Sequence, residues 1–156
     1  MTLIEVMIVV LLIGLLSLAA SPFTGAWVRG ADVSKTLAVL EQAVGSAKAT
    51  ALRNEAGVMG DAAAGALCLN DGTLQLVTAV AGGGAINCSS VSAAAVLWST
   101  PISDSVAIKE GNAGWTCSCF TNKGLLTSTA PNCGLCGTSL TFTVASGAES
   151  ETLSLY

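Results

Sequence analysis

The sequence predicts an α+β protein in which a long N-terminal helix has one half protruding and apolar and the other half packed on an antiparallel β-sheet head. Three observations predict this fold class. An almost unbroken apolar run opens the chain, an amphipathic pattern of helical period follows it, and the rest alternates short strand-like segments with turn residues. We therefore divide the chain into a helix over residues 1–53 and a β-rich head over residues 54–156.

The first half of the helix, residues 1–25, is apolar on every side. From Met1 to Ala20 only Thr2, Glu5 and Ser17 carry polar side chains. Twenty residues in a helix extend about 30 Å, the thickness of a bilayer core, so we expect this half to lie in a membrane or in the core of an assembly. No basic residue precedes the run, as a signal peptide would require, and we expect any leader to have been removed.

The second half of the helix, residues 26–53, is amphipathic. Small and apolar residues recur there at alternating spacings of four and three, which places them on one face of a helix. We expect this face to pack on the sheet. It consists of Ala26, Gly30, Val33, Leu37, Leu40, Val44, Ala47 and Ala51.

Glu5 is the one charged side chain of the apolar half. A carboxylate among apolar side chains is costly unless donors or an opposite charge offset it. Two interpretations stay open. Either the positive end of the helix dipole favours the carboxylate, or it pairs with another chain, such as the N-terminal amine of a neighbouring subunit.

Five segments of the head have strand character, and a sixth is ambiguous. We expect an antiparallel sheet of at least about four strands that buries one face on the helix. The expected strands lie at 73–77, 106–109, 115–120, 139–144 and 152–156, and the ambiguous segment is 91–98.

The six cysteines all lie in the head, and an even number in a turn-rich domain indicates three disulfides formed in an oxidising compartment. We expect Cys68 to pair with Cys88 across the 73–77 strand. Cys117 and Cys119 lie two apart on one strand and share a face, so each is expected to pair with one of Cys133 and Cys136. Two alternatives are a metal site formed by these last four cysteines and a thiol-redox motif at Cys133-Gly-Leu-Cys136.

Composition excludes several function classes. The chain has no histidine, which removes Ser-His and Cys-His catalysis and histidine metal sites, and we expect neither an enzyme nor a cofactor. The net charge is −4, and nucleic-acid binding is not expected because few basic residues are available to contact phosphates. After residue 53 only Lys109 and Lys123 are basic, against the acids Glu55, Asp61, Asp71, Asp104, Glu110, Glu149 and Glu151.

The segment Met1-Thr2-Leu3-Ile4-Glu5-Val6-Met7-Ile8-Val9-Val10, with Gly14 and Pro22, resembles the mature N-terminus of type IV pilins and type II secretion pseudopilins. The resemblance implies a lollipop-shaped subunit whose Met1 is exposed by a prepilin peptidase and N-methylated. It implies residence in the inner membrane, then assembly by the pilus machinery into an extracellular helical filament of identical subunits at the bacterial cell surface.

Within that family, the expected function is that of a structural subunit of a type IV pilus, with Glu5 as the assembly residue. The alternative is a minor pilin or a type II secretion pseudopilin of the H type, because residues 37–54 also resemble that group. Adhesion, motility and secretion are the activities that such filaments imply.

Gly14 and Pro22 are the expected weak points of the helix. Proline lacks the N–H that the helix needs and clashes with the preceding turn, and glycine is a poor helix former. We expect residues 14–22 to lose regular helical hydrogen bonds in the assembled filament, as commonly occurs in the family that the chain resembles. A filament reconstruction checks this, and a continuous regular helix through these residues there would contradict it.

Overall fold

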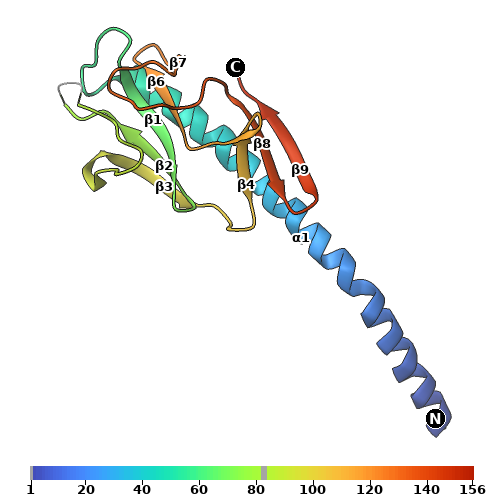
Figure 1. Ribbon diagram of the computed structural model, residues 1–156. Helices are drawn as coiled ribbons and strands as arrows, with labels where there is room; N and C mark the ends of the chain where they lie inside the picture. Colours follow the sequence, from blue (N-terminus) through green and yellow to red (C-terminus); the bar gives the residue numbers. More distant parts are fainter. Residues whose placement is uncertain (1, 82–83) are drawn as a thin grey trace.

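The computed structural model describes residues 2–81 and 84–156, and only the backbone of residues 18–23. Helix α1 (Leu3–Arg53) is 51 residues long, and a head made of two antiparallel sheets surrounds its C-terminal part. The N-terminal part of α1 projects away from the head as a bare rod (Figure 1).

The strands form two sheets of five and four strands, and one 3₁₀ turn precedes β3. The five-stranded sheet has the order β3-β2-β1-β6-β7, and the four-stranded sheet has the order β5-β4-β8-β9. The bounds are β1 (Ala63–Asn70), β2 (Thr73–Thr78), η1 (Ala93–Ala95), β3 (Val96–Pro101), β4 (Ala107–Glu110), β5 (Ala113–Gly114), β6 (Cys117–Thr121), β7 (Leu126–Thr127), β8 (Thr141–Ser146) and β9 (Glu149–Ser154).

The expected fold class requires two corrections. The head contains two sheets instead of one, because the chain leaves the first sheet at Pro101 and β4 then pairs with β8 and not with β3. In addition, no helix among the described residues is long and apolar enough to cross a membrane.

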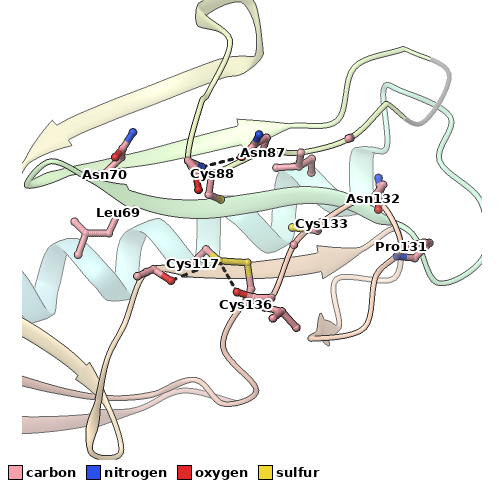
Figure 2. A pocket seen from close by; sticks show the side chains of 15 residues that line it. Leu69, Asn70, Asn87, Cys88, Cys117, Pro131, Asn132, Cys133 and Cys136 are labelled. Atoms are coloured by element: carbon pink, nitrogen blue, oxygen red, sulfur yellow. Dashed lines mark hydrogen bonds between the residues drawn. A yellow bond between two sulfur atoms is a disulfide. The ribbon is translucent and has the colours of Figure 1, made fainter.

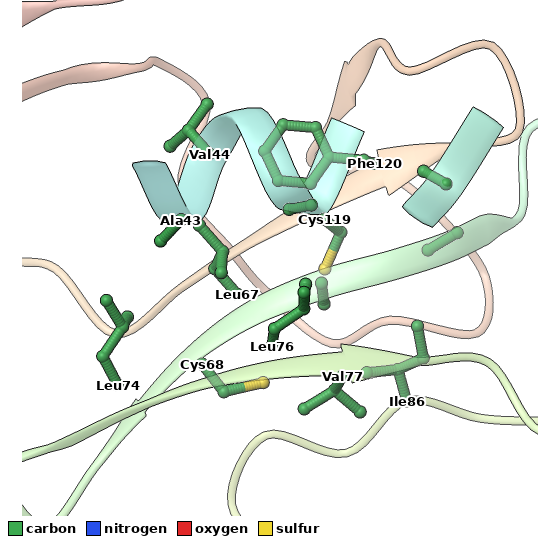
Figure 3. Close-up of a cluster of buried hydrophobic side chains, with 14 of the residues drawn as sticks. Ala43, Val44, Leu67, Cys68, Leu74, Leu76, Val77, Ile86, Cys119 and Phe120 are labelled. Atoms are coloured by element: carbon green, nitrogen blue, oxygen red, sulfur yellow. The ribbon is translucent and has the colours of Figure 1, made fainter. Parts of the chain in front are cut away.

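The amphipathic half of α1 packs on the head through part of the predicted face, because Ala26, Gly30 and Leu37 stay half-buried. Leu40, Val44, Ala47 and Ala51 are buried, and the helix contacts β1, β2 and β6 of the five-stranded sheet as well as β8 and β9 of the other. In Figure 3, Ala43 of the helix lies beside Leu67 of the five-stranded sheet. Burying each larger side chain of this core contributes about 1.5–3 kcal/mol.

The central strand β1 was missed by the sequence analysis. Its sequence, Ala-Ala-Gly-Ala-Leu-Cys-Leu-Asn, has few β-branched or aromatic residues and does not read as a strand. Small residues are needed there because the helix lies directly on the strand. A Cβ atom at Gly65 would lie 3.7 Å from the Cβ of Ala51 and 3.5 Å from the carbonyl oxygen of Val77, so little more than a methyl group fits.

The other expected strands are confirmed in position. The ambiguous segment 91–98 divides into the turn η1 and the start of β3, and the last strand begins three residues earlier than expected. The observed counterparts of the five expected strands are β2, β4, β6, β8 and β9.

Residues 115–116 join the two sheets. The backbone N–H of Trp115 donates to the carbonyl of Ile108 on β4, and the carbonyl of Thr116 accepts from Leu69 on β1. The Trp115 ring is buried edge-on against Phe142 of β8 with centroids 5.3 Å apart, and its indole N–H donates to Ser118 Oγ at 3.0 Å. One aromatic side chain therefore couples the cores of both sheets.

The Asn132 side chain forms hydrogen bonds with the backbone of Ala63 as a neighbouring strand would. Its amide nitrogen donates to the Ala63 carbonyl at 2.9 Å, and its amide oxygen accepts from the Ala63 N–H at 2.7 Å. The Asn132 carbonyl also accepts from the N–H of Ile86 at 2.6 Å. The side chain thus satisfies both backbone groups of a buried residue at the start of β1.

We expect Asn132→Ala to lower the free energy of unfolding by about 1–3 kcal/mol, because it leaves a buried N–H and a buried carbonyl without partners. Urea unfolding under non-reducing conditions measures the effect. Asn112→Ala is the matched control, since Asn112 is exposed in the β4–β5 turn and its loss is expected to cost less than about 0.5 kcal/mol. Equal stability of both variants would contradict the assignment.

Candidate functional site

The most distinctive surface of the molecule is the N-terminal part of α1. Every described side chain from Thr2 to Ser17 is exposed. The large apolar side chains among them are 48% to 80% exposed, from Val6 at the lower end to Leu3 at the upper end. No other part of the described chain covers this apolar surface.

Such exposure is unusual for a chain that acts alone. Monomeric proteins rarely present contiguous apolar patches larger than a few hundred Å², and larger ones mark interaction surfaces. Here the apolar surface surrounds the helix, so a partner that covers one side would leave the other in water. The geometry therefore fits enclosure by several neighbours better than a single docking partner.

Glu5 interacts with the start of its own helix. The N–H of Thr2 points to Glu5 Oε2 at 3.4 Å, and the Glu5 N–H donates to the Thr2 carbonyl at 3.1 Å. This arrangement has the form of a capping box, in which a third-position Glu serves the backbone of the N-cap residue. The expected pairing of Glu5 with the amine of another subunit stays a prediction, and Met1 lies outside the described residues.

The two expected weak points, Gly14 and Pro22, both lie within α1. The backbone of α1 is helical through Gly14 and Pro22 in the isolated chain. Our expectation of unwinding concerns the assembled state, and it therefore stays a prediction.

Three disulfides close the head, and their pairing confirms the prediction. Cys68 is bonded to Cys88. The sequence left two pairings open for the remaining four cysteines, and the structure has Cys117–Cys136 and Cys119–Cys133. The four sulfurs of the alternative metal site are therefore not thiolates, and Cys133 is not bonded to Cys136.

The bridges lie on the face of the five-stranded sheet that points away from the helix. Gly65 and Leu67 face α1, so the next residue along β1, Cys68, has the opposite orientation. Cys68 is in register with Cys117, and Ala66 is in register with Cys119, so these side chains share that face. No helix of the described chain covers this sheet face, and the disulfides attach loops to it.

A pocket of about 620 Å³ opens between these loops. Figure 2 shows Asn87 and Cys88 on one side and the 131–136 loop, with the Cys117–Cys136 bridge, on the other. The two loops are joined by a short parallel backbone pairing between Ile86 and Cys133. Nothing in the sequence pattern indicated this pocket, because it is formed by loops that are distant along the chain.

The side chain of Glu110 holds the C-terminal end of the loop that carries Cys133 and Cys136. Its Oε1 atom accepts from the backbone N–H groups of Thr138 at 2.8 Å and Ser139 at 2.7 Å. A Cβ atom at Gly137 would overlap the Glu110 carboxylate, so glycine is required for this close approach. The loop that carries Cys133 and Cys136 is therefore held at both of its ends.

Sequence reasoning also missed two exposed apolar side chains. Trp27 on α1 is 77% exposed where the helix enters the head, and Leu135 at the tip of the disulfide-bonded loop is 98% exposed. Their exposure could not be predicted from periodicity, because a periodic pattern needs several residues and each of these is a single one.

Comparisons of the chain with protein-family models, with curated proteins and with solved structures give no match.

Proposed function

We propose that this chain is a structural subunit of a type IV pilus filament, assembling through the exposed apolar part of α1. The observation that carries the proposal is the exposure of every described side chain from Thr2 to Ser17. Burial of this surface among the helices of other copies removes it from water on all sides, which is the main favourable term in association.

The distribution of features along the chain supports this proposal. The bare half of α1 lies at one end of the molecule and the head at the other (Figure 1). Copies related by rotation and translation make a heterologous contact that does not close, and such contacts build helical filaments. The apolar helices then form the filament core and the heads form its outer surface.

The three disulfides fit the proposed location at the outside of the cell. Disulfides form and persist in oxidising compartments, and they are rare in the cytosol. We propose the major subunit, present along the whole filament, and not a minor pilin or a secretion pseudopilin. The abundance of this chain in sheared surface filaments tests that choice.

We expect Val10→Lys to prevent filament formation. An unpaired charge buried in the helix core costs about 3–5 kcal/mol, and 1.4 kcal/mol corresponds to a factor of ten in an association constant. Assembly is therefore expected to weaken by more than about 100-fold. Sheared filament mass, measured against total cellular subunit, quantifies the effect.

The matched control is Val80→Lys. Val80 is a valine of the head with an exposed fraction of 54%, close to the 63% of Val10, so only the location differs. This variant is expected to assemble normally. Normal filaments from Val10→Lys, or equal loss in both variants, would contradict assembly through the helix.

We expect Glu5→Ala and Glu5→Gln to impair assembly equally. In the proposed core the carboxylate is desolvated, and an opposite charge on an adjacent subunit, the Met1 amine, offsets that cost. Glutamine keeps a side-chain oxygen that can accept the Thr2 N–H but loses the charge. Filament yield at equal subunit level is the measurement, and wild-type yield from Glu5→Gln would show that Glu5 serves only as a cap.

A further inference from the structure

The three disulfides form one continuous sulfur cluster. The Sγ atoms of Cys88, Cys117 and Cys136 all lie within 4.8 Å of one another, and so do those of Cys119, Cys133 and Cys136. Cys136 belongs to both groups, so its sulfur lies next to all three bridges. A thiolate released at one bridge therefore has a neighbouring disulfide in reach.

Access to the cluster from solvent is unequal. Cys88 and Cys136 are half-buried and line the pocket of about 620 Å³, whereas Cys68 and Cys119 have no exposed surface. Cys117 and Cys133 are each only 5% exposed. Cys117 and Cys133 also line the pocket, but Cys88 and Cys136 are the more exposed residues, so an incoming thiolate is expected to reach one of these two first.

The two accessible sulfurs differ in the thiolate that each attack would release. Attack at Cys88 releases Cys68, which is fully buried among apolar side chains, where a thiolate is disfavoured. Attack at Cys136 releases Cys117, whose Sγ lies 3.9 Å from the hydroxyl of Thr116 and 3.6 Å from the carbonyl oxygen of Leu135. Because the hydroxyl can donate to the released thiolate and offset the repulsion from that carbonyl, the Cys117–Cys136 bridge is the one favoured for cleavage.

We propose that the Cys117–Cys136 disulfide is a thiol–disulfide exchange site that accepts a dithiol protein of the oxidising compartment, with Cys136 as the sulfur attacked. This inference does not depend on the proposed filament function. The pocket admits the partner's thiol, and the exposed Leu135 beside it offers an apolar contact.

The exchange is balanced in two steps. One thiolate of the dithiol attacks Cys136 Sγ, a mixed disulfide forms, and Cys117 leaves as a thiolate. The second thiolate of the dithiol then attacks its own partner sulfur in the mixed disulfide, which closes the dithiol into a disulfide and releases Cys136 as a thiolate. Two electrons pass to the bridge, and the two protons of the dithiol pass to Cys117 and Cys136.

The cluster then allows an internal relay. The Cys136 thiolate lies within 4.8 Å of Cys133 Sγ and can attack it, forming Cys133–Cys136 and releasing Cys119 as a thiolate. Cys119 is as buried as Cys68, so this step is expected to be slower than the first cleavage. No electrons enter or leave in this step. An isomerising dithiol can thus rearrange pairings throughout the cluster from a single point of entry, which serves a head whose cysteines lie close enough to pair wrongly.

The experiment uses the oxidised full-length chain and dithiothreitol as the probe dithiol. After short exposure and acid quenching, free thiols are alkylated and mapped by mass spectrometry. We expect Cys117 and Cys136 to be alkylated first, at least about tenfold faster than Cys68. A later two-thiol species should carry label on Cys117 and Cys119 with Cys133 linked to Cys136.

A monothiol probe identifies the sulfur that is attacked. Glutathione is expected to add to Cys136 and not to Cys88. Early labelling of Cys68, simultaneous labelling of all six cysteines, or a glutathione adduct mainly on Cys88 would overturn the proposal. Absence of the Cys133–Cys136 species would overturn the relay.

Thr116 variants test the leaving-group argument without altering any cysteine. We expect Thr116→Val to slow the first reduction by about two- to tenfold, the range of one hydrogen bond, and Thr116→Ser to retain the native rate. Equal rates for both variants would refute the role of the hydroxyl.

Discussion

The close contact between α1 and β1 sets the arrangement of both sheets. Small residues on both elements, Ala47 and Ala51 on the helix and Gly65 on the strand, let the helix lie directly on the middle of the five-stranded sheet. The strands β2 and β6 flank β1 on its two sides, and the same helix also contacts β8 and β9 of the second sheet. Both sheets are thereby organised around the C-terminal half of one helix, and the described side chains from Thr2 to Ser17 are left without cover.

The opposite face of the five-stranded sheet is protected in a different way. No helix covers it in the described part of the chain, and loops take that place, attached by the three disulfides. Bridges that close loops of this length stabilise a fold by roughly 3 kcal/mol each through loss of chain entropy in the unfolded state. Asn132 and Glu110 complete the attachment by satisfying backbone groups that a regular strand or helix would otherwise satisfy. Disulfides, a side-chain amide and a carboxylate thus replace a second layer of secondary structure.

The difference between the two parts of the molecule supports the proposed function. The apolar core of the head is covered on one side by the helix and on the other by the disulfide-bonded loops. The apolar side chains of the bare part of α1 stay exposed, because no described part of the chain covers them. The same chain segment continues from one part into the other, so association through the bare part would place the heads on the outside of an assembly.

The helix, most of its buried face and the Cys68–Cys88 pairing could be predicted from the sequence, since these follow from local periodicity and from spacing along the chain. For the other four cysteines the sequence left two pairings open, and the folded structure selects one of them. Val33, Leu40 and Val44 repeat with the helical period, and the alternation at Cys117 and Cys119 puts both on one face. Only the tertiary structure decided that Ala63–Asn70 is the central strand, because its small residues are selected by closeness to the helix and not by strand propensity. It also decided that there are two sheets and that six sulfurs meet in one cluster, since both depend on contacts between segments far apart in the chain.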